Sequence, residues 1–246
     1  MRLRDRIATP EGKRRYVRTL FATIADRYDF ITVALSYGQD RRWKRRLVQL
    51  AAVRPGVHAL DLATGTGDIA FELAAYGADV IGLDITERMI ELARAKVARA
   101  FQANDRYNVG SAHFLVADML ALPFPSAAFD VVTTGYGLRN VPQLTPAIDE
   151  IKRVLKPGGQ LLSLDFNRPS NAIVRRAYLA YLTTVGSVLG WVLHRDPDTY
   201  RYIPASIRQY PGAPAVARLL ESRGFASARY YPVLGGLMAI HHAVRS

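Results

Sequence analysis

The chain of 246 residues contains no cysteine. This absence excludes a disulfide scaffold, a cysteine nucleophile and a zinc site with thiolate ligands. Histidine is scarce as well, and the five histidines form no H-E-x-x-H pair, so we expect no metal site. Half of the residues are apolar and 22% are charged, which is the balance of an ordinary globular protein and excludes disorder over most of the chain.

Long hydrophobic runs are nearly absent too. The one long stretch without a charge runs from Ala177 to Leu193, is at the short limit for a membrane span and is diluted by threonine, serine and glycine. We therefore predict a buried or interfacial helix there. The N-terminus is basic but is followed by no apolar run, which predicts a protein without a signal peptide that stays in the cytoplasm.

Positive charge, in contrast, is abundant. The chain has 33 Lys and Arg against 21 Asp and Glu, a formal net charge of +12, and residues 41–46 hold five cations in six positions. Such a surface attracts nucleic acid, anionic lipid or acidic ligands. On composition alone, a solvated basic surface explains the charge equally well.

The apolar pattern changes its period near residue 55. Before it, apolar residues recur at steps of three and four from Val17 to Leu35, after a Thr9-Pro10 helix start, and predict a helical arm. After it, strands and helices alternate, which predicts an α/β fold with a mainly parallel, Rossmann-like doubly wound sheet closed by an antiparallel pair. The predicted strands are 57–63, 79–83, 113–117, 129–134, 160–165, 225–233 and 236–244, and Lys156–Gly159 is a predicted turn.

A glycine loop follows the first predicted strand. Residues 65–70 read GTGDIA and fit G-x-G-x-x-[GA], a weak signal alone but a stronger one between a strand and a helix. Asp61 and Asp68 flank the loop, and no Lys or Arg lies between residues 55 and 87. Two carboxylates would repel a pyrophosphate, so they favour a ligand that presents a cation. S-adenosylmethionine has a sulfonium, an ammonium and no phosphate.

Two further carboxylates follow later strands. Asp84 lies 17 residues after Gly67, at the end of the second strand, where a carboxylate can accept hydrogen bonds from both ribose hydroxyls. Asp118 follows the third strand and could accept from the adenine amino group. Either one taken singly also fits a helix cap or a turn. Together with the loop they favour the S-adenosylmethionine interpretation over a dinucleotide.

At this point the chain resembles the class I S-adenosylmethionine-dependent methyltransferases, and within them the ubiquinone/menaquinone biosynthesis C-methyltransferases. The glycine loop and the KPGG turn are generic to methyltransferases, whereas the arm ending in R-x-W-K, the G-L-R-N-V run and Y-I-P-x-S-I are specific to this branch. The matching stretches are residues 27–48, 60–70, 117–141, 153–169, 202–207 and 235–243.

The resemblance implies a seven-stranded sheet and methyl transfer to a ring carbon of a polyprenyl quinol. Demethylmenaquinol is the first acceptor to consider, the ubiquinone-pathway benzoquinol is another, and a different small phenolic or lipid acceptor stays open. The family's contact at the position of Gly135 is commonly serine, whereas glycine offers no side chain for such a contact. With the loop, the cofactor set becomes Asp61, Gly65, Thr66, Gly67, Asp84, Ile85, Asp118, Met119 and Gly135.

The resemblance also makes Arg139 and Asn140 the catalytic candidates. Arginine cannot easily act as a base at neutral pH, so its guanidinium would stabilise the developing phenolate and hold a water that carries the proton. Asn140 would orient the same hydroxyl, and an Arg–carboxylate pair that fixes the loop is the competing interpretation. His241 could receive a proton, although a histidine in a strand is more often structural. The substrate side would be lined by Tyr28, Tyr202 and Ser206.

We expect a single domain whose lid and basic clusters draw the quinol from an anionic membrane surface, at the inner face of the cell membrane. No stacking motif interleaves aromatics with the basic runs, so we expect no nucleic-acid partner, and a homodimer stays open. The expected parts are a helical arm (1–54), a cofactor-binding core (55–168), a lid or substrate insertion (169–212), and a C-terminal helix with a strand pair (213–246).

Overall fold

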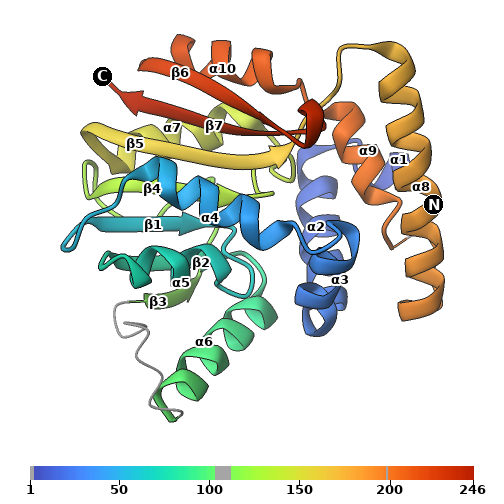
Figure 1. Cartoon of the computed structure of the whole chain (residues 1–246), viewed down its shortest axis with the longest axis horizontal. Coiled ribbons are helices and arrows are strands. Elements are labelled where there is room, and N and C mark those ends of the chain that lie inside the picture. The colour runs from blue at the N-terminus through green and yellow to red at the C-terminus, as the bar shows by residue number, and fades with distance from the viewer. Residues whose placement is uncertain (1–2, 103–111, 198) are drawn as a thin grey trace.

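The computed structural model describes residues 3–102, 112–197 and 199–246. Its centre is a seven-stranded sheet in the order β3-β2-β1-β4-β5-β7-β6 (Figure 1). β7 runs antiparallel to both of its neighbours, and the other described pairs are parallel, which confirms the predicted fold class. The strands are β1 (His58–Leu62), β2 (Asp79–Asp84), β3 (Ala112–Val116), β4 (Phe129–Gly135), β5 (Leu155–Phe166), β6 (Phe225–Val233) and β7 (Met238–Arg245).

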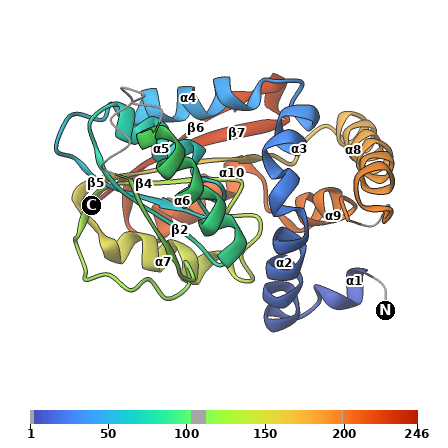
Figure 2. The same cartoon turned by 90° about the horizontal axis from the view of Figure 1, so that it is seen from below.

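Helices cover both faces of the sheet, so the molecule has three layers (Figure 2). One face carries α4 (Asp40–Ala51), α5 (Asp68–Ala75) and α6 (Glu87–Gln102), and the other carries α7 (Leu144–Val154) and α10 (Ala213–Ser222). Each face has its own apolar cluster, the first around Leu47 and Leu73 and the second around Ile148 and Leu220. A parallel sheet buried on both faces explains the near-continuous apolar runs of its strands.

The arm lies across the carboxyl ends of the strands (Figure 1). It consists of α1 (Leu3–Arg6), α2 (Pro10–Ile24), a 3-10 turn at Ala25–Arg27 and α3 (Tyr28–Leu35). Thr9 caps α2 as predicted, since its side-chain oxygen accepts from the backbone N–H of Gly12 at 3.1 Å. The apolar residues from Leu20 to Leu35 pack into one cluster, although the 3-10 turn divides the arm into α2 and α3.

The uncharged stretch makes up most of a helix, α8 (Ala172–His194), which lies beyond the strand ends beside α9 (Tyr202–Gln209) (Figure 1). Asn171 caps it by accepting from two backbone N–H groups. Within the described residues, α8 is the one helix whose length and composition would suffice to cross a bilayer. Its inner side packs on α9 and the arm, and its outer side exposes Ile173, Val188 and Trp191.

The sequence predicted a turn at the KPGG segment before the fifth strand. In the structure this segment lies inside β5. Phe129 of β4 pairs with Leu155, whereas Val131 pairs with Gln160, so the extra residues form an irregularity in the ladder. Gly158, at φ +77°, supplies the left-handed backbone that this irregularity needs. The ladder therefore continues where a turn-rich sequence indicates its end.

Candidate active site

Two cavities meet at the carboxyl ends of β1, β2 and β4. The first has a volume of about 80 Å³ and lies over the strand ends, under α2. Among the residues predicted to bind the cofactor, it is lined by Gly65, Asp84, Ile85, Asp118, Met119 and Gly135. The topology thus brings together residues that are up to 70 positions apart in the sequence, from Gly65 to Gly135.

The glycine loop holds Asp84 in this cavity. The backbone N–H of Gly65 donates to Asp84 Oδ2 at 3.1 Å, and the N–H of Thr86 donates to Oδ1 at 2.8 Å. Burial raises the pKa of Asp84, and these hydrogen bonds oppose that rise. Each carboxylate oxygen keeps a further acceptor site, so the side chain can accept from a vicinal pair of hydroxyls.

Asp61 and Gly67 support the loop from behind. Asp61 is fully buried and accepts from the hydroxyls of Thr64 and Thr133 at 2.6 and 2.7 Å. Burial raises its pKa to about 6. Gly67 lies at φ +93°, and a Cβ there would approach the rings of Phe71 and Phe114 to 2.8 and 2.9 Å. Gly67 therefore serves the backbone and the packing, and it does not line the first cavity.

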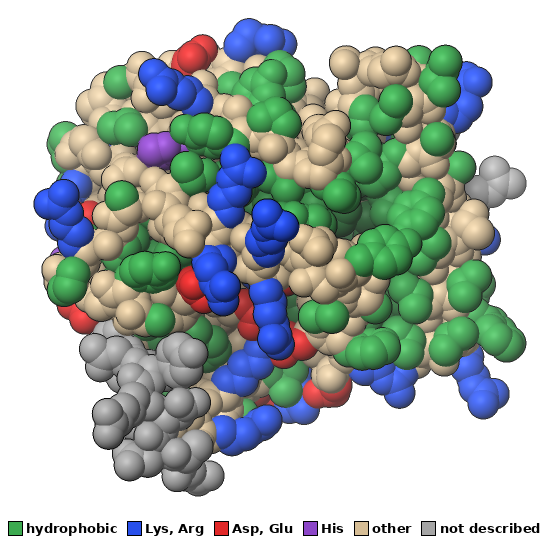
Figure 3. All heavy atoms as spheres, viewed as in Figure 1, with side chains coloured by type: hydrophobic (Ala, Val, Ile, Leu, Met, Phe, Trp, Pro, Cys, Tyr) green, Lys and Arg blue, Asp and Glu red, His purple; other side chains and the backbone are tan. Residues whose placement is uncertain are grey.

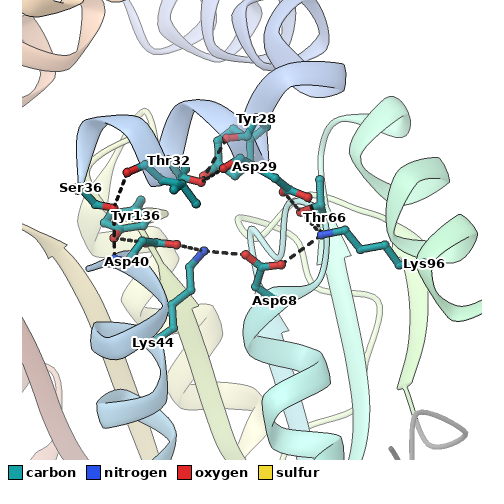
Figure 4. A network of polar contacts seen from close by, with 11 residues as sticks. Tyr28, Asp29, Thr32, Ser36, Asp40, Lys44, Thr66, Asp68, Lys96 and Tyr136 are labelled. Atoms are coloured by element: carbon teal, nitrogen blue, oxygen red, sulfur yellow. Dashed lines mark hydrogen bonds and ion pairs between the residues drawn. The ribbon is translucent and has the colours of Figure 1, made fainter. Parts of the chain in front are cut away.

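One electrostatic argument from the sequence is wrong. Asp68 does not lack a cation, because Lys44 and Lys96 approach its carboxylate at 2.9 and 3.1 Å (Figure 4). Burial alone would raise the pKa of Asp68, but the two ammonium groups outweigh it and hold the value at about 2. Both lysines lie outside residues 55–87, on α4 and α6, so counting the charges of the loop region missed them.

A small pocket beside the loop has both signs of charge on its walls. Lys44, Asp61, Thr66 and Asp68 line it, as a zwitterionic amino-acid group requires. The hydroxyl of Thr66 donates to Asp29 on α3 at 2.5 Å and accepts from Lys96 at 2.9 Å. These contacts fasten the glycine loop to the arm (Figure 4).

Asp118 and Gly135 both line the first cavity. Asp118 is ion-paired with Arg14 of α2 at 2.6 Å and also accepts from the N–H of Leu120. At Gly135, an added Cβ would approach Ile69 Cδ1 to 2.7 Å. The isoleucine thus fills the place where the resembled family commonly has a serine side chain.

The second cavity is larger and mostly apolar, with a volume of about 520 Å³ (Figure 3). Its walls come from α2, α3, α4, α8, α9 and the start of β7, and Tyr28 and Tyr202 lie among them. Of the described residues that line it, Arg139 is the one cation and Asp40 the one carboxylate. This size is typical of a site for a small organic ligand.

Arg139 lies at the base of this cavity and is 6% exposed. Its Nε is 3.0 Å from Asp165 Oδ1, and its Nη1 donates to Asn140 Oδ1 and Ser206 Oγ. Its guanidinium also lies 4.8 Å from the ring centre of Phe166. The Arg–carboxylate pair considered from the sequence is therefore present, and it holds the guanidinium against the cavity rather than away from it.

Tyr28 and Tyr136 line both cavities. Burial raises the pKa of each hydroxyl. Tyr136 lies at φ +62°, between Gly135 and Gly137, and its hydroxyl donates to Asp40 Oδ1 at 2.6 Å. A left-handed backbone at an aromatic residue is strained, and such strain is concentrated at functional sites.

The structure does not bring His241 or Ser206 into either cavity. His241 is buried in β7, its Nε2 lies 3.1 Å from the carbonyl of Ala213, and burial lowers its pKa. Ser206 is fully buried behind Arg139, where its hydroxyl accepts from the guanidinium and donates to the carbonyl of Ile203. In this structure His241 of β7 and Ser206 of α9 are therefore buried in the protein interior.

Sequence reasoning missed Asp40, Tyr136 and Lys44. Lys44 was counted within the basic run 41–46, but it is buried between Asp40 and Asp68 and contacts their carboxylates at 2.6 and 2.9 Å. The helical phase offered a signal, because Trp43, Lys44 and Leu47 share the apolar side of α4 while Arg41 and Arg45 do not.

Comparison of the sequence with known proteins identifies the family of the chain. The model described as the ubiE/COQ5 methyltransferase family matches residues 9–245. The chain belongs to the ubiE/COQ5 methyltransferase family. It is 36% identical over 233 residues to the ubiquinone/menaquinone biosynthesis C-methyltransferase UbiE of Teredinibacter turnerae, covering 94% of this chain and 91% of the relative. The UbiE of Azotobacter vinelandii is also 36% identical, over 97% of this chain and 93% of the relative.

Solved structures agree on the fold. A SAM-dependent methyltransferase from Aquifex aeolicus superposes with a TM-score of 0.59 at 17% identity, covering 82% of this chain and 89% of that one. A phosphoethanolamine N-methyltransferase from Haemonchus contortus, solved with S-adenosylmethionine, superposes with a TM-score of 0.59 at 14% identity. The match covers 83% of this chain and 52% of that one. This member of the ubiE/COQ5 family is thus an S-adenosylmethionine-dependent methyltransferase, and the acidic strand ends, glycine loop and two-sign pocket fit that cofactor.

Proposed function

We propose that this enzyme methylates a ring carbon of a polyprenyl quinol in respiratory quinone biosynthesis. The observation that carries the proposal is the meeting of the two cavities at Tyr28 and Tyr136. A cofactor cavity with polar strand ends adjoins there an apolar cavity of about 520 Å³ with a single guanidinium at its base. That combination suits an aromatic ring with one or two hydroxyls and an apolar tail.

The cofactor supplies an electrophilic methyl group, and the chain's residues hold the reactants. Asp84 would accept from the ribose hydroxyls, Asp118 from the adenine amino group, and the pocket of Lys44, Asp61 and Thr66 would take the amino-acid end. Arg139, fixed by its ion pair with Asp165, would stabilise negative charge on the quinol oxygen. Asn140 is bonded to the same guanidinium and would orient the hydroxyl.

Demethylmenaquinol is the acceptor that we propose first, because the apolar cavity has room for a bicyclic ring and the first isoprene unit. The ubiquinone-pathway benzoquinol has the same reactive group and is the second candidate. The UbiE relatives have both pathways in their names, which supports either acceptor. A different phenolic or lipid acceptor is the alternative. It is favoured by Gly135, which stands where the family commonly has serine and where the Ile69 side chain fills the space.

A methylation assay with mass spectrometry tests the proposal. Purified enzyme and S-adenosylmethionine are given chemically reduced demethylmenaquinone, the unreduced quinone and a prenylated benzoquinol. We expect one added methyl group on a quinol and none on the quinone, because a quinone ring is electrophilic. No product with any quinol, together with intact cofactor binding, would refute the quinol assignment and leave the methyltransferase.

We also propose that the rim of the apolar cavity rests on an anionic membrane surface from which the tail enters. The outer sides of α3 and α8 expose large apolar side chains, among them Phe30 at 62% and Trp191 at 66%. Tyr37 and Tyr181, which join these two helices through their hydroxyls, line the cavity itself. Exposed Arg176 and Arg195 flank the apolar side of α8, and each well-placed cation adds about 1 kcal/mol near anionic lipid.

Sedimentation with vesicles that contain anionic lipid tests this surface. We expect a Trp191→Ser Val192→Ser variant to bind about tenfold more weakly than the parent enzyme, since it removes two apolar groups from the interface. Tyr76→Ser is the matched control, because Tyr76 is also an exposed aromatic residue but ends α5 on the sheet. Equal loss in both variants, or no binding by the parent, would contradict the membrane assignment.

A further inference from the structure

Methylation of a quinol carbon requires an acceptor for the hydroxyl proton, because charge must be pushed onto the ring. Arg139 cannot accept it, since a guanidinium stays protonated in proteins. His241 does not reach the cavities. Among the described residues that line the apolar cavity, Asp40 is the one carboxylate, and no histidine or glutamate accompanies it.

We propose that Asp40 receives the proton of the quinol hydroxyl, relayed by the hydroxyl of Tyr136. This inference rests on the proposed quinol substrate and assigns the proton pathway within the same site. The two residues come from separate parts of the chain, α4 and the turn after β4, and they meet at the wall between the cavities.

The geometry around Asp40 is that of a fixed acceptor. Its carboxylate takes one hydrogen bond from Tyr136 at 2.6 Å and an ion pair from Lys44 at 2.6 Å, and its own N–H is bonded to Ser36 Oγ (Figure 4). Lys44 in turn contacts Asp68 beside the glycine loop. The Lys44 ammonium group thus ties Asp40, at the wall of the apolar cavity, to Asp68 at the glycine loop.

Tyr136 is placed to relay rather than to act as a base. Burial raises the pKa of its hydroxyl well above the usual value, and the neighbouring Asp40 raises it further, so it stays protonated. A protonated hydroxyl can accept a proton on its lone pair while giving its own proton to Asp40. Its left-handed backbone, flanked by Gly135 and Gly137, places Tyr136 in the lining of both cavities, with its hydroxyl on Asp40.

The protons and bonds balance without a further reagent. The quinol O–H bond breaks, the proton passes to Tyr136 as the tyrosine proton passes to Asp40, and the oxygen lone pair moves into the ring. The ring carbon then forms its C–C bond as the methyl–sulfur bond of the cofactor breaks. Water then takes the ring proton from the methylated carbon, and the electrons of that C–H bond restore the aromatic ring. Asp40 returns its proton through Tyr136 to the oxygen. One proton is released to solvent in total.

Asp40→Asn tests the proposal, because it keeps the shape and one acceptor oxygen for Tyr136 but removes the basic group. We expect kcat for the quinol to fall about 100-fold, the magnitude of general base catalysis. The dissociation constant for S-adenosylmethionine and the KM for the quinol should change less than threefold. Tyr136→Phe, which removes the relay, should show the same pattern.

A series of quinols with increasingly acidic hydroxyls separates proton transfer from a structural role. The loss of kcat in Asp40→Asn should shrink as the hydroxyl becomes more acidic, because less help is needed. In Asp40→Ala, added formate should restore part of the rate, since the adjacent cavity admits it. A loss that is equal for all quinols and insensitive to formate would overturn the proposal, as would wild-type kcat in Asp40→Asn.

Asp26→Asn is the matched control. Asp26 is an arm carboxylate ion-paired with Arg88 at 2.6 Å, but it is exposed and lines neither cavity, so its variant should keep wild-type kcat. The parent enzyme separates the two proposals. If it methylates no quinol, the proposed function fails, whereas an active parent with an active Asp40→Asn variant refutes only the role of Asp40.

Discussion

The two cavities of the molecule are built in different ways. The cofactor cavity is formed mainly by the segments that follow β1, β2, β3 and β4, and its two carboxylates, Asp84 and Asp118, accept from backbone N–H groups there. The apolar cavity is enclosed by helices from two separate parts of the chain, α2 to α4 and α8 to α9, and its polar residues are held by other side chains. The position of the cofactor cavity is therefore set by the sheet, whereas the apolar cavity is set by the helices that pack beyond the strand ends.

This difference teaches that cofactor affinity and turnover should respond to separate sets of residues. Side chains supported by the sheet can change cofactor binding without disturbing the apolar cavity. Side chains supported by one another, such as Arg139 and Asp165, combine catalysis with stability, because a buried charge that loses its partner is costly. The following substitutions test that separation.

Arg139→Ala should have the largest effect. We expect turnover to fall about 10²- to 10³-fold through loss of charge stabilisation, with cofactor affinity near wild type. Because Asp165 is left buried without its partner, the free energy of unfolding should also fall by about 3–5 kcal/mol. Turnover, titration calorimetry and chemical denaturation measure the three quantities.

The exposed pair of Arg223 and Asp149, at 2.6 Å, is the control for that experiment. Arg223→Ala should leave the free energy of unfolding nearly unchanged, because solvent screens the pair. Near-normal turnover in Arg139→Ala would remove the guanidinium from the reaction.

Asp84→Ala should weaken cofactor binding, because Asp84 lines the cofactor cavity. Loss of a charged acceptor for the ribose hydroxyls costs about 2–3 kcal/mol, so the dissociation constant for S-adenosylmethionine should rise about 30- to 150-fold. The KM for the quinol should stay within threefold. Asp84→Asn keeps an oxygen for Gly65 or Thr86 and should lose less. An unchanged dissociation constant in calorimetry would contradict the ribose assignment.

Cofactor binding should also depend on pH through Asp61, with the smallest effect of the three. Burial raises its pKa to about 6 in the free protein, so it is largely protonated at pH 5. A bound ammonium favours the carboxylate and lowers that pKa, so binding releases a proton and tightens as pH rises. From pH 5 to pH 7 the affinity should increase up to about tenfold. Asp61→Asn should flatten this dependence, and an equal slope in both proteins would refute it.

The cofactor side could be predicted from the sequence to a large extent. Gly65, Asp84 and Asp118 each follow a predicted strand, and the carboxyl ends of parallel strands share one edge of a sheet, so order along the chain implies proximity. The charge balance of that side could not be predicted in the same way. Lys44 and Lys96 reach Asp68 from helices whose packing is not encoded in the loop.

The apolar side could be predicted only in outline. The period of apolar residues indicated the arm and an interfacial helix, but not that α2, α3, α8 and α9 enclose one cavity. Asp40 directly precedes the basic run 41–46 and Tyr136 lies between two glycines, where neither residue type signals a function by itself. Their meeting depends on a contact across 96 positions, and local pattern does not specify such contacts.

The shared wall between the cavities has a kinetic consequence. Phe21 of α2 lines both, and the same helix covers the cofactor cavity. A lipid tail seated against Phe21 and Ile24 would keep α2 from moving aside. Substrates should therefore load in a compulsory order, cofactor before quinol, and the demethylated cofactor should be the last product to leave.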